Sequence, residues 1–396
     1  MSSSVYRRLN GLFPATTSTS SLPKTPKTKN PLPKTPKTKN LLDIVENFKK
    51  SSDSEHFRNR ASSYKATVRR LFNAGKLSYI EDILEHQKRY KNITNERFTV
   101  RIMSLYGKYG MFEHAHKLFD EMPHLKCDRT VVSFNALLGA YVNSKNFDKI
   151  GQLFRELPEK LSIQPDTVSY NTVVKAFCQM GSFDAARSVI EEMEKNGIGP
   201  DLITFNTLLD AFCRNNRISD TEKVLAQMEE KNVVPNARSY NPKLRGLVAD
   251  NRISEAVEVF EEMRRKGVKP DIYSFNALIK GFWVSKNLEE AKRWYCEIAK
   301  NDCAPDRATI TMLLFLACDE GDFDFALELC KEAFHQRFLV KSAKLQCVVD
   351  GLAKESEKKK KKLDEAKELL ELGKSNYKLK VPADTKEQSY SFSVLV

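Results

Sequence analysis

The 396-residue chain has few residues of the kinds that build catalytic or metal centres. Its eight cysteines never form a C-x-x-C pair, and Cys178, Cys213 and Cys318 are separated by multiples of 35 residues, which is typical of packing residues in a reducing compartment. His114 and His116 have no partner ligands at zinc spacing, and the deaminase signature of H-x-E with P-C-x-x-C is absent. These absences predict that the chain is not an enzyme and needs neither a metal nor a cofactor.

The chain also lacks any apolar run of about 18 residues, so no membrane span is expected. Acidic residues are missing from residues 1–42, whose eight Lys and Arg account for +8 of the formal net charge of +13. This segment begins with Arg7, Arg8 and a Ser/Thr run, and continues with a tandem Pro/Lys/Thr sequence at 22–30 and 32–40. We therefore predict an organellar transit peptide followed by a low-complexity segment, both excluded from the fold.

A unit of 35 residues fills most of the remaining chain. Val168-Ser-Tyr-Asn171, Ile203-Thr-Phe-Asn206 and Tyr273-Ser-Phe-Asn276 fall 35 or 70 residues apart, which indicates a stacked repeat array rather than a compact globule. The predicted organisation is a linker or leading helix at 43–60, eight repeats at 61–341, a degenerate capping repeat at 342–380 and a tail at 381–396. The repeat frames are 61–95, 96–130, 131–166, 167–201, 202–236, 237–271, 272–306 and 307–341, the third with one extra residue near Leu161.

Apolar residues recur within each unit at intervals of three and four, so each unit is predicted to form two amphipathic helices and the fold is predicted to be all-α. Ser or Thr at the third position, as in Ser169 and Thr204, is interpreted as the cap of the first helix. The first helix is expected to end near Gly181, Asn216, Asn251 or Gly321. Small residues at the tenth position predict close helix approach: Ala140, Ala176, Ala211, Gly246 and Gly281.

Packing does not account for an asparagine at the fifth position of five consecutive units. Asn is a mediocre helix former, and the cap is already assigned to Ser or Thr. The last position of the same units is restricted to Asp or Asn. We interpret these two residues as a polar pair that contacts a repeating ligand such as a nucleic acid strand; the alternative is that the Asp and Asn residues only assist the start of the next helix.

The motifs Val168-Ser-Tyr-Asn-Thr172 and Lys266-Gly-Val-Lys-Pro-Asp271 resemble the P class of pentatricopeptide repeat proteins, and the resemblance covers nearly all of residues 61–380. It implies a right-handed superhelical solenoid of about nine hairpins that binds single-stranded RNA, one base per repeat. In the family, the fifth residue hydrogen-bonds a base edge, the last residue biases the base, and the second residue packs against base faces.

Carried over to this chain, the resemblance assigns base recognition to the fifth-position residues Asn135, Asn171, Asn206, Asn241 and Asn276, and to the last-position residues Asp166, Asp201, Asn236, Asp271 and Asp306. The base-sandwiching residues are Val132, Val168, Ile203, Arg238 and Tyr273. The family pattern then implies a pyrimidine preference of U-U-C-U-U, read from 5′ to 3′ as the chain runs from N to C. Pro242, directly after Asn241, is expected to distort that residue's position.

The flanking units depart from the pattern and predict no base. Their fifth positions hold Lys65, Val100, Thr311 and Gln346, and their last positions hold Asn95, Thr130 and Lys341. A five-base tract recurs too often to select one transcript, so we expect protein neighbours to hold the array near its RNA. Lys175, Arg245 and Lys280 share the ninth position and are candidates for phosphate contacts; an ordinary solvated helix face is the alternative.

The segments 133–138, 144–148, 161–166 and 294–298 are similar to pentatricopeptide proteins associated with the small subunit of plant mitochondrial ribosomes. This implies a mitochondrial protein, with the chloroplast as alternative, that binds ribosomal RNA and ribosomal proteins and acts in translation. Two other hypotheses stay open. The chain is then either a free factor that stabilises or activates a few organellar transcripts, or a protein-binding helical scaffold.

Overall fold

The computed structural model describes residues 36–354 and 360–378, and all regular structure in these residues is helical, with no strand among them. The all-α class is therefore confirmed. The chain divides into two compact parts, an N-terminal part and a C-terminal part, with the boundary between His86 and Gln87. None of the described helices combines the length and apolar character needed to cross a bilayer.

The N-terminal part is held together by an aromatic cluster. Phe48 packs edge-on against Phe57 and Tyr64, with ring centroids 5.2 and 5.0 Å apart. Tyr64 is completely buried, so this cluster forms the centre of a small core. The helices of the N-terminal part are α2 (Pro36–Ser51), α3 (Glu55–Asn59), α4 (Ala61–Asn73) and α5 (Leu77–Glu85). The 3-10 helix η1 (His86–Arg89) spans the boundary.

Helix α2 begins before the boundary predicted between residues 42 and 43. It starts at Pro36, because proline is well tolerated at the first position of a helix. The buried Val45 and Phe48 continue a three-to-four spacing from Leu41, which is half-buried, so one amphipathic helix runs across the predicted boundary. Residues 1–35, with most of the predicted transit peptide, and the predicted tail at 381–396 lie outside the described residues.

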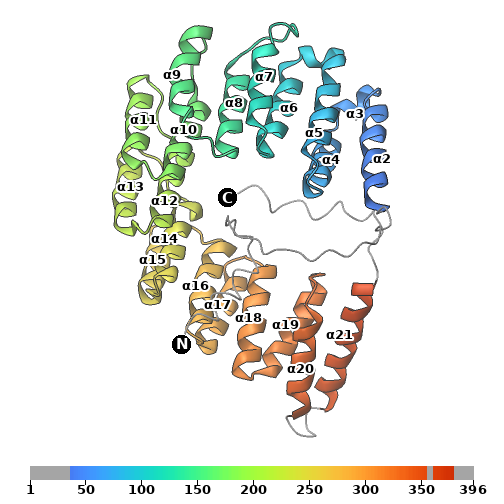
Figure 1. The fold of residues 1–396 in the computed structure, drawn as a ribbon. Coiled ribbons are helices and arrows are strands. Elements are labelled where there is room, and N and C mark those ends of the chain that lie inside the picture. Colours follow the sequence, from blue (N-terminus) through green and yellow to red (C-terminus); the bar gives the residue numbers. More distant parts are fainter. Residues whose placement is uncertain (1–35, 355–359, 379–396) are drawn as a thin grey trace, which may run out of the picture. The chain divides into compact units, whose positions relative to one another are not determined.

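The C-terminal part is a series of helical hairpins (Figure 1). From Ala61 in the N-terminal part to Ser342 in the C-terminal part, each hairpin begins with a helix whose first residue is the first residue of a sequence frame. After η2 (Lys91–Thr94), the first helices are α6 (Glu96–Lys108), α8 (Val131–Asn143), α10 (Thr167–Met180), α12 (Leu202–Arg214), α14 (Ala237–Ala249), α16 (Ile272–Val284), α18 (Arg307–Glu320) and α20 (Ser342–Lys354). The second helices are α7 (Phe112–Glu121), α9 (Ile150–Leu161), α11 (Phe183–Lys195), α13 (Ile218–Glu230), α15 (Ile253–Arg265), α17 (Leu288–Lys300), α19 (Phe323–His335) and α21 (Lys360–Lys378).

Neighbouring hairpins share their cores. From α8 to α18, each first helix contacts the first helices before and after it, as α8 does with α6 and α10. Phe260 of α15 packs against both helices of the next hairpin, with ring centroids 5.1 Å from Phe275 and 4.9 Å from Trp294. The tenth position is tightly packed as expected, since a Cβ atom at Gly246 would lie 3.2 Å from Ile218. A single hairpin therefore cannot bury its apolar surface alone.

In the second to eighth repeats, two left-handed residues per repeat end the helices. The first helices end at residues with positive φ that include the predicted Gly181, Asn216, Asn251 and Gly321, so these predictions are confirmed. Lys145 and Lys286 take the same conformation, with φ of 56° and 58°, although lysine does not favour it. The second helices end before Lys126, Ser162, Gly197, Asn232, Gly267, Asp302 and Arg337.

The third repeat accommodates its extra residue in a different place from the one predicted. Helix α9 ends at Leu161 and is followed at once by the left-handed Ser162, whereas α11, α13, α15, α17 and α19 each end two residues before their left-handed residue. The segment between α8 and α9, residues 144–149, is longer than the two-residue segment 181–182 between α10 and α11 in the next repeat. The insertion therefore lengthens the turn between the two helices.

Candidate nucleic-acid interface

The first helices are capped by the last residue of the preceding unit. The Asp166 carboxylate accepts a hydrogen bond from the backbone amide of Ser169 at 2.9 Å, and the Asp201 carboxylate does the same for Thr204 at 2.9 Å. The predicted assignment of the cap to Ser or Thr at the third position is therefore wrong. The caps of helices α10, α12, α14, α16 and α18 are Asp166, Asp201, Asn236, Asp271 and Asp306.

The Ser and Thr residues at the third position complete capping boxes instead. The hydroxyl oxygen of Ser169 accepts from the Asp166 backbone amide at 3.2 Å, while the Ser169 hydroxyl donates toward the preceding unit. These hydroxyl residues are fully buried or nearly so: Ser133, Ser169, Thr204, Ser239, Ser274 and Thr309. The reciprocal arrangement satisfies two amides that a helix start would otherwise leave unpaired.

The fifth-position asparagines connect neighbouring hairpins. The Asn171 side-chain amide donates to the Asp201 carboxylate at 3.0 Å, and its oxygen accepts from the Thr204 hydroxyl at 2.5 Å. Equivalent amide-to-carboxylate bonds join Asn135 to Asp166 at 2.9 Å, Asn241 to Asp271 at 3.0 Å and Asn276 to Asp306 at 3.1 Å. An amide suits this position because it both donates and accepts. The expectation that packing offers no reason for this asparagine is therefore wrong.

The pair Asn206 and Asn236 differs from the other four. The Asn206 oxygen still accepts from Ser239, at 2.7 Å. Asn236 caps helix α14 by accepting from the backbone amide of Arg238 at 3.0 Å, but these two described residues share no hydrogen bond. The Asn206 amide group is therefore less constrained than that of Asn171.

Pro242 does not displace Asn241. Helix α14 continues through Pro242, and Asn241 keeps both its contacts, with Asp271 and, at 2.7 Å, with Ser274. The proline lies in the first two turns of the helix, where few intrahelical amide bonds are lost. The expected distortion is absent from this part of the structure.

The caps carry negative charge that the hydrogen bonds stabilise. Burial disfavours the charged form of Asp166, but hydrogen bonds from Asn135 and Ser169 outweigh it, so the pKa of Asp166 is lowered. Burial acts in the same way on Asp201, and the bonds from Thr204 and Asn171 again lower its pKa. Both carboxyl groups are therefore ionised at neutral pH.

Four of the five second-position residues are exposed apolar side chains beside the asparagines. Val132, Val168, Ile203 and Tyr273 have exposed fractions of 47, 56, 63 and 44%, and Arg238 is also exposed. Positions two and five are three residues apart, so they lie on the same helix face. Exposed apolar side chains that recur once per hairpin are unneeded by the core and form a candidate contact surface for flat, apolar groups.

Basic residues lie one turn further along the same face, at the ninth position. Arg245 is bound by the Asp210 carboxylate at 2.8 Å, and Asp210 also binds Arg214 at 2.8 Å. Lys175 and Lys280 make no ion pair in the described part of the chain, and Lys280 is exposed. Lys175 and Lys280 are thus available for the predicted phosphate contacts, whereas Arg245 is held in an ion pair with Asp210.

The flanking units do not share this arrangement. The Thr311 hydroxyl donates to the Arg307 carbonyl at 2.6 Å, and the Gln346 amide donates to Asp350 at 2.9 Å, so both bond within their own helix. Val100 has no polar group. Sequence reasoning missed Glu96, whose carboxylate takes hydrogen bonds from the start of helix α8. The linked row of asparagines therefore comprises units three to seven.

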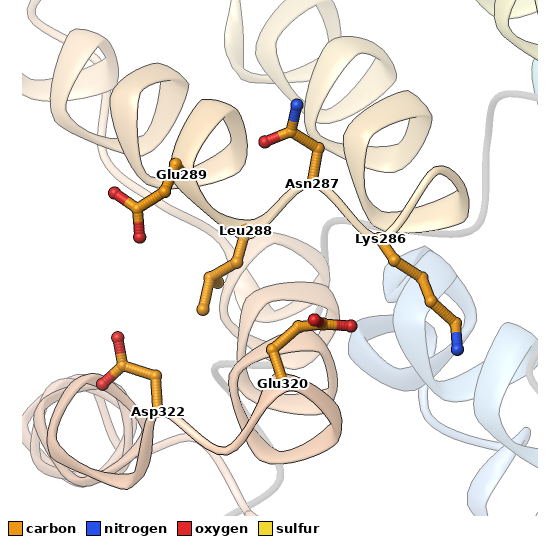
Figure 2. Close-up of a pocket in the computed structure, with 6 residues that line it drawn as sticks. All are labelled: Lys286, Asn287, Leu288, Glu289, Glu320 and Asp322. Atoms are coloured by element: carbon orange, nitrogen blue, oxygen red, sulfur yellow. The ribbon is translucent and has the colours of Figure 1, made fainter.

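One pocket and two buried thiols among the described residues do not compete with this face. A pocket at the turns after α16 and α18 is lined by Lys286, Asn287, Leu288, Glu289, Glu320 and Asp322 (Figure 2), and its three carboxylates would repel phosphate. Burial raises the pKa of Cys178 and Cys213 to about 12, which keeps these thiols protonated and unreactive. The described residues contain no group of His, Cys, Asp and Glu that could hold a metal ion.

Comparison with known proteins agrees with this architecture. Similar proteins of Arabidopsis thaliana include a pentatricopeptide repeat-containing protein that is 57% identical over 150 residues, which are 38% of this chain and 27% of that protein. The small ribosomal subunit proteins mS78 and mS79 are 55 and 53% identical over 151 residues, which are 38% of this chain and 38% of each relative. The matched segment thus spans well under half the length of these relatives.

Among solved structures, maize PPR10 is 18% identical, with a TM-score of 0.48 over 84% of this chain and 54% of that one. The PPR repeat family model matches residues 129–179, 165–214, 200–248 and 239–284, and the PPR repeat model matches 101–127 and 273–303. These matches take in about half of the chain, which therefore belongs to the pentatricopeptide repeat family.

Proposed function

We propose that the chain binds single-stranded RNA in the mitochondrion, associates with the small ribosomal subunit and acts in mitochondrial translation. One observation carries the RNA-binding part. In five consecutive units, an exposed second-position side chain lies one helical turn from an asparagine whose orientation is set by its neighbours. A ligand with one flat group per unit matches this spacing, and RNA bases are such groups.

The asparagines retain hydrogen-bonding capacity for a base. Asn171 uses one amide hydrogen for Asp201 and one oxygen lone pair for Thr204, which leaves one hydrogen and one lone pair. The Watson–Crick edge of a pyrimidine offers a matching acceptor and donor. Because the side chain is already held in place, binding costs little further conformational entropy.

The proposed preference of units three to seven is U-U-C-U-U. Its third base falls at Asn206 and Asn236, the one pair of the five without a bond between fifth and last residues. The other four units place a carboxylate against the asparagine amide. The missing bond to the Asn206 amide is a physical basis for a different base at this position.

Similarity to mS78 and mS79 supports association with the small ribosomal subunit. A row of five recognition units supports it as well, because five bases do not select one site among many competing RNAs. Neighbouring ribosomal proteins would supply the remaining specificity, with ribosomal RNA as the ligand.

RNA binding is tested with the purified chain and two oligonucleotides, U-U-C-U-U and A-A-A-A-A, each flanked by the same inert sequence. Asn171→Ala with Asn206→Ala should weaken binding to the pyrimidine RNA by at least about tenfold, since two bases lose their polar partners. Asn301→Ala is the matched control, because Asn301 is a hydrogen-bonded asparagine at a helix end outside the row. Unchanged RNA affinity in a folded double variant would favour a protein-binding scaffold.

The partner is tested by crosslinking in isolated mitochondria followed by sequencing of the bound RNA. Predominantly small-subunit ribosomal RNA supports a ribosomal role. Enrichment of one or two messages at pyrimidine-rich sites would replace it with a transcript-specific factor.

A further inference from the structure

Glu96, at the first position of the second unit, replaces the asparagine as the link to the next hairpin. We propose, resting on the proposed function, that Glu96 closes the second unit to RNA and so fixes the 5′ end of the RNA footprint at the third unit. Glu96 is the first residue of α6, and Val100, one turn later on the same face, holds the fifth position.

The Glu96 carboxylate makes hydrogen bonds to the start of the next hairpin. In later repeats, such bonds are divided between the fifth residue and the helix cap. One oxygen accepts from the backbone amides of Thr130 at 2.9 Å and Ser133 at 3.1 Å, and both oxygens lie 2.9 Å from the Thr130 hydroxyl. In the next unit, the corresponding amide of Ser169 is bound by the last-position Asp166. Glu96 therefore binds the helix-start amide that a last-position carboxylate binds in later repeats, while Thr130 remains the cap of helix α8 and accepts from the amide of Val132 at 3.1 Å.

With Glu96 in the linking role of the asparagine, neighbouring hairpins stay bonded to each other, but the amide group needed for base recognition is absent. An asparagine offers a donor and an acceptor, whereas an ionised carboxylate offers acceptors only. Burial disfavours the charged form of Glu96, but hydrogen bonds from Thr130 and Ser133 lower its pKa, so the charge persists at neutral pH. A carboxylate beside an apolar Val100 gives a base no hydrogen-bond donor.

Because of this arrangement, changing only the fifth and last residues of the second repeat, Val100 and Thr130, should not make the repeat recognise a base. Replacing Thr130 by Asp would bring a second carboxylate to the Ser133 amide that Glu96 already binds. Two like charges at one site disfavour each other strongly. An asparagine introduced at Val100 would then meet a disrupted cap, so Glu96 must be removed before the unit can accept a base.

The experiment compares RNAs that carry U or A immediately 5′ of U-U-C-U-U. The unmodified chain and the V100N/T130D variant should bind both RNAs equally. The E96A/V100N/T130D variant should prefer the RNA with the additional U by about tenfold, the discrimination that one recognised base supplies. E96A alone should show no preference, because Val100 has nothing to recognise.

Two results would overturn the proposal: an equal preference for U in V100N/T130D with Glu96 intact, or no preference in the triple variant. If E96A unfolds the second unit, seen as loss of helical circular dichroism, E96Q/V100N/T130D gives the same test, since glutamine retains an acceptor without the charge. Binding of U-U-C-U-U over A-A-A-A-A by the unmodified chain is measured first, so that failure of the proposed function is distinguished from failure of the Glu96 proposal.

Discussion

Asn171 donates a hydrogen bond of 3.0 Å to Asp201, thirty positions later in the chain, and accepts one of 2.5 Å from Thr204. The fifth and last residues of one unit and the third residue of the next thus form one connected group. The side chains proposed to contact RNA are at the same time part of the contact between hairpins. Their effects on folding and on binding must therefore be measured together.

The first prediction concerns this pair. A double-mutant cycle with Asn171→Ala and Asp201→Ala should give a coupling free energy of about 1 kcal/mol in thermal or urea unfolding, the net value of one hydrogen bond. The same cycle at Asn206 and Asn236 is the control and should give a value near zero, since no bond joins them. Equal coupling in both cycles would contradict the bonding pattern.

The second prediction is that Asn236→Asp creates the missing bond to Asn206. The variant should gain about 0.5–1.5 kcal/mol of stability and shift the preference at the third base from C toward U. Competition between U-U-C-U-U and U-U-U-U-U measures the preference, and Asp201→Asn is the reverse control. A stabilised variant with unchanged preference would separate the bond from base choice.

The third prediction separates binding from folding at the second position. Val168→Ser and Ile203→Ser should weaken RNA binding several-fold, because apolar contact with base faces is lost. Both side chains are more than half exposed, so the free energy of unfolding should change by less than about 0.5 kcal/mol. The buried Val173 is the control: Val173→Ala should destabilise the fold. A large loss of stability at Ile203 would show that it belongs to the core.

The fourth prediction is a gain of RNA affinity on removal of an acid. Asp210→Asn releases Arg245 and Arg214 from their ion pairs, so that a freed guanidinium can bind phosphate. The affinity should rise a few-fold, and the slope of its salt dependence should steepen by about one. Adding Arg245→Gln should cancel most of the gain; an unchanged salt slope in Asp210→Asn would place Arg245 away from the RNA.

The fifth prediction is a loss of stability in acid. The pKa values of Asp166 and Asp201 are lowered by folding, so their contribution is complete above their ordinary pKa of 3.8 and is lost as the pH falls through the lower folded-state value. The melting temperature should therefore fall on acidification below about pH 4. Asp166→Asn with Asp201→Asn should flatten this dependence, and an unaltered acid profile would assign it to other groups.

Much of the fold was predictable because the repeat determines both the helix starts and the turns. Gly181 and Asn216 identify turns by residue type, but Lys145 and Lys286 take the same conformation only because the repeat places them there. The early start of α2 was hidden by a proline-rich composition that looks disordered.

The cap assignment failed for a local reason. Asp166 and Ser169 are both good capping residues, three positions apart, and each takes part in the same capping box. Sequence alone does not say which of the two stands outside the helix. The bridge through Asn135 joins residues 31 and 34 positions apart, beyond the range of any local pattern.

The capping network also limits how such a repeat can diverge. A fifth residue that loses its donor or its acceptor changes not only a base contact but also the seam between two hairpins. Asn206 shows that the seam tolerates the loss of one bond, whereas Glu96 keeps the seam and gives up the amide donor. New RNA preferences are therefore more accessible through the last residue, which can alternate between Asp and Asn, than through the fifth.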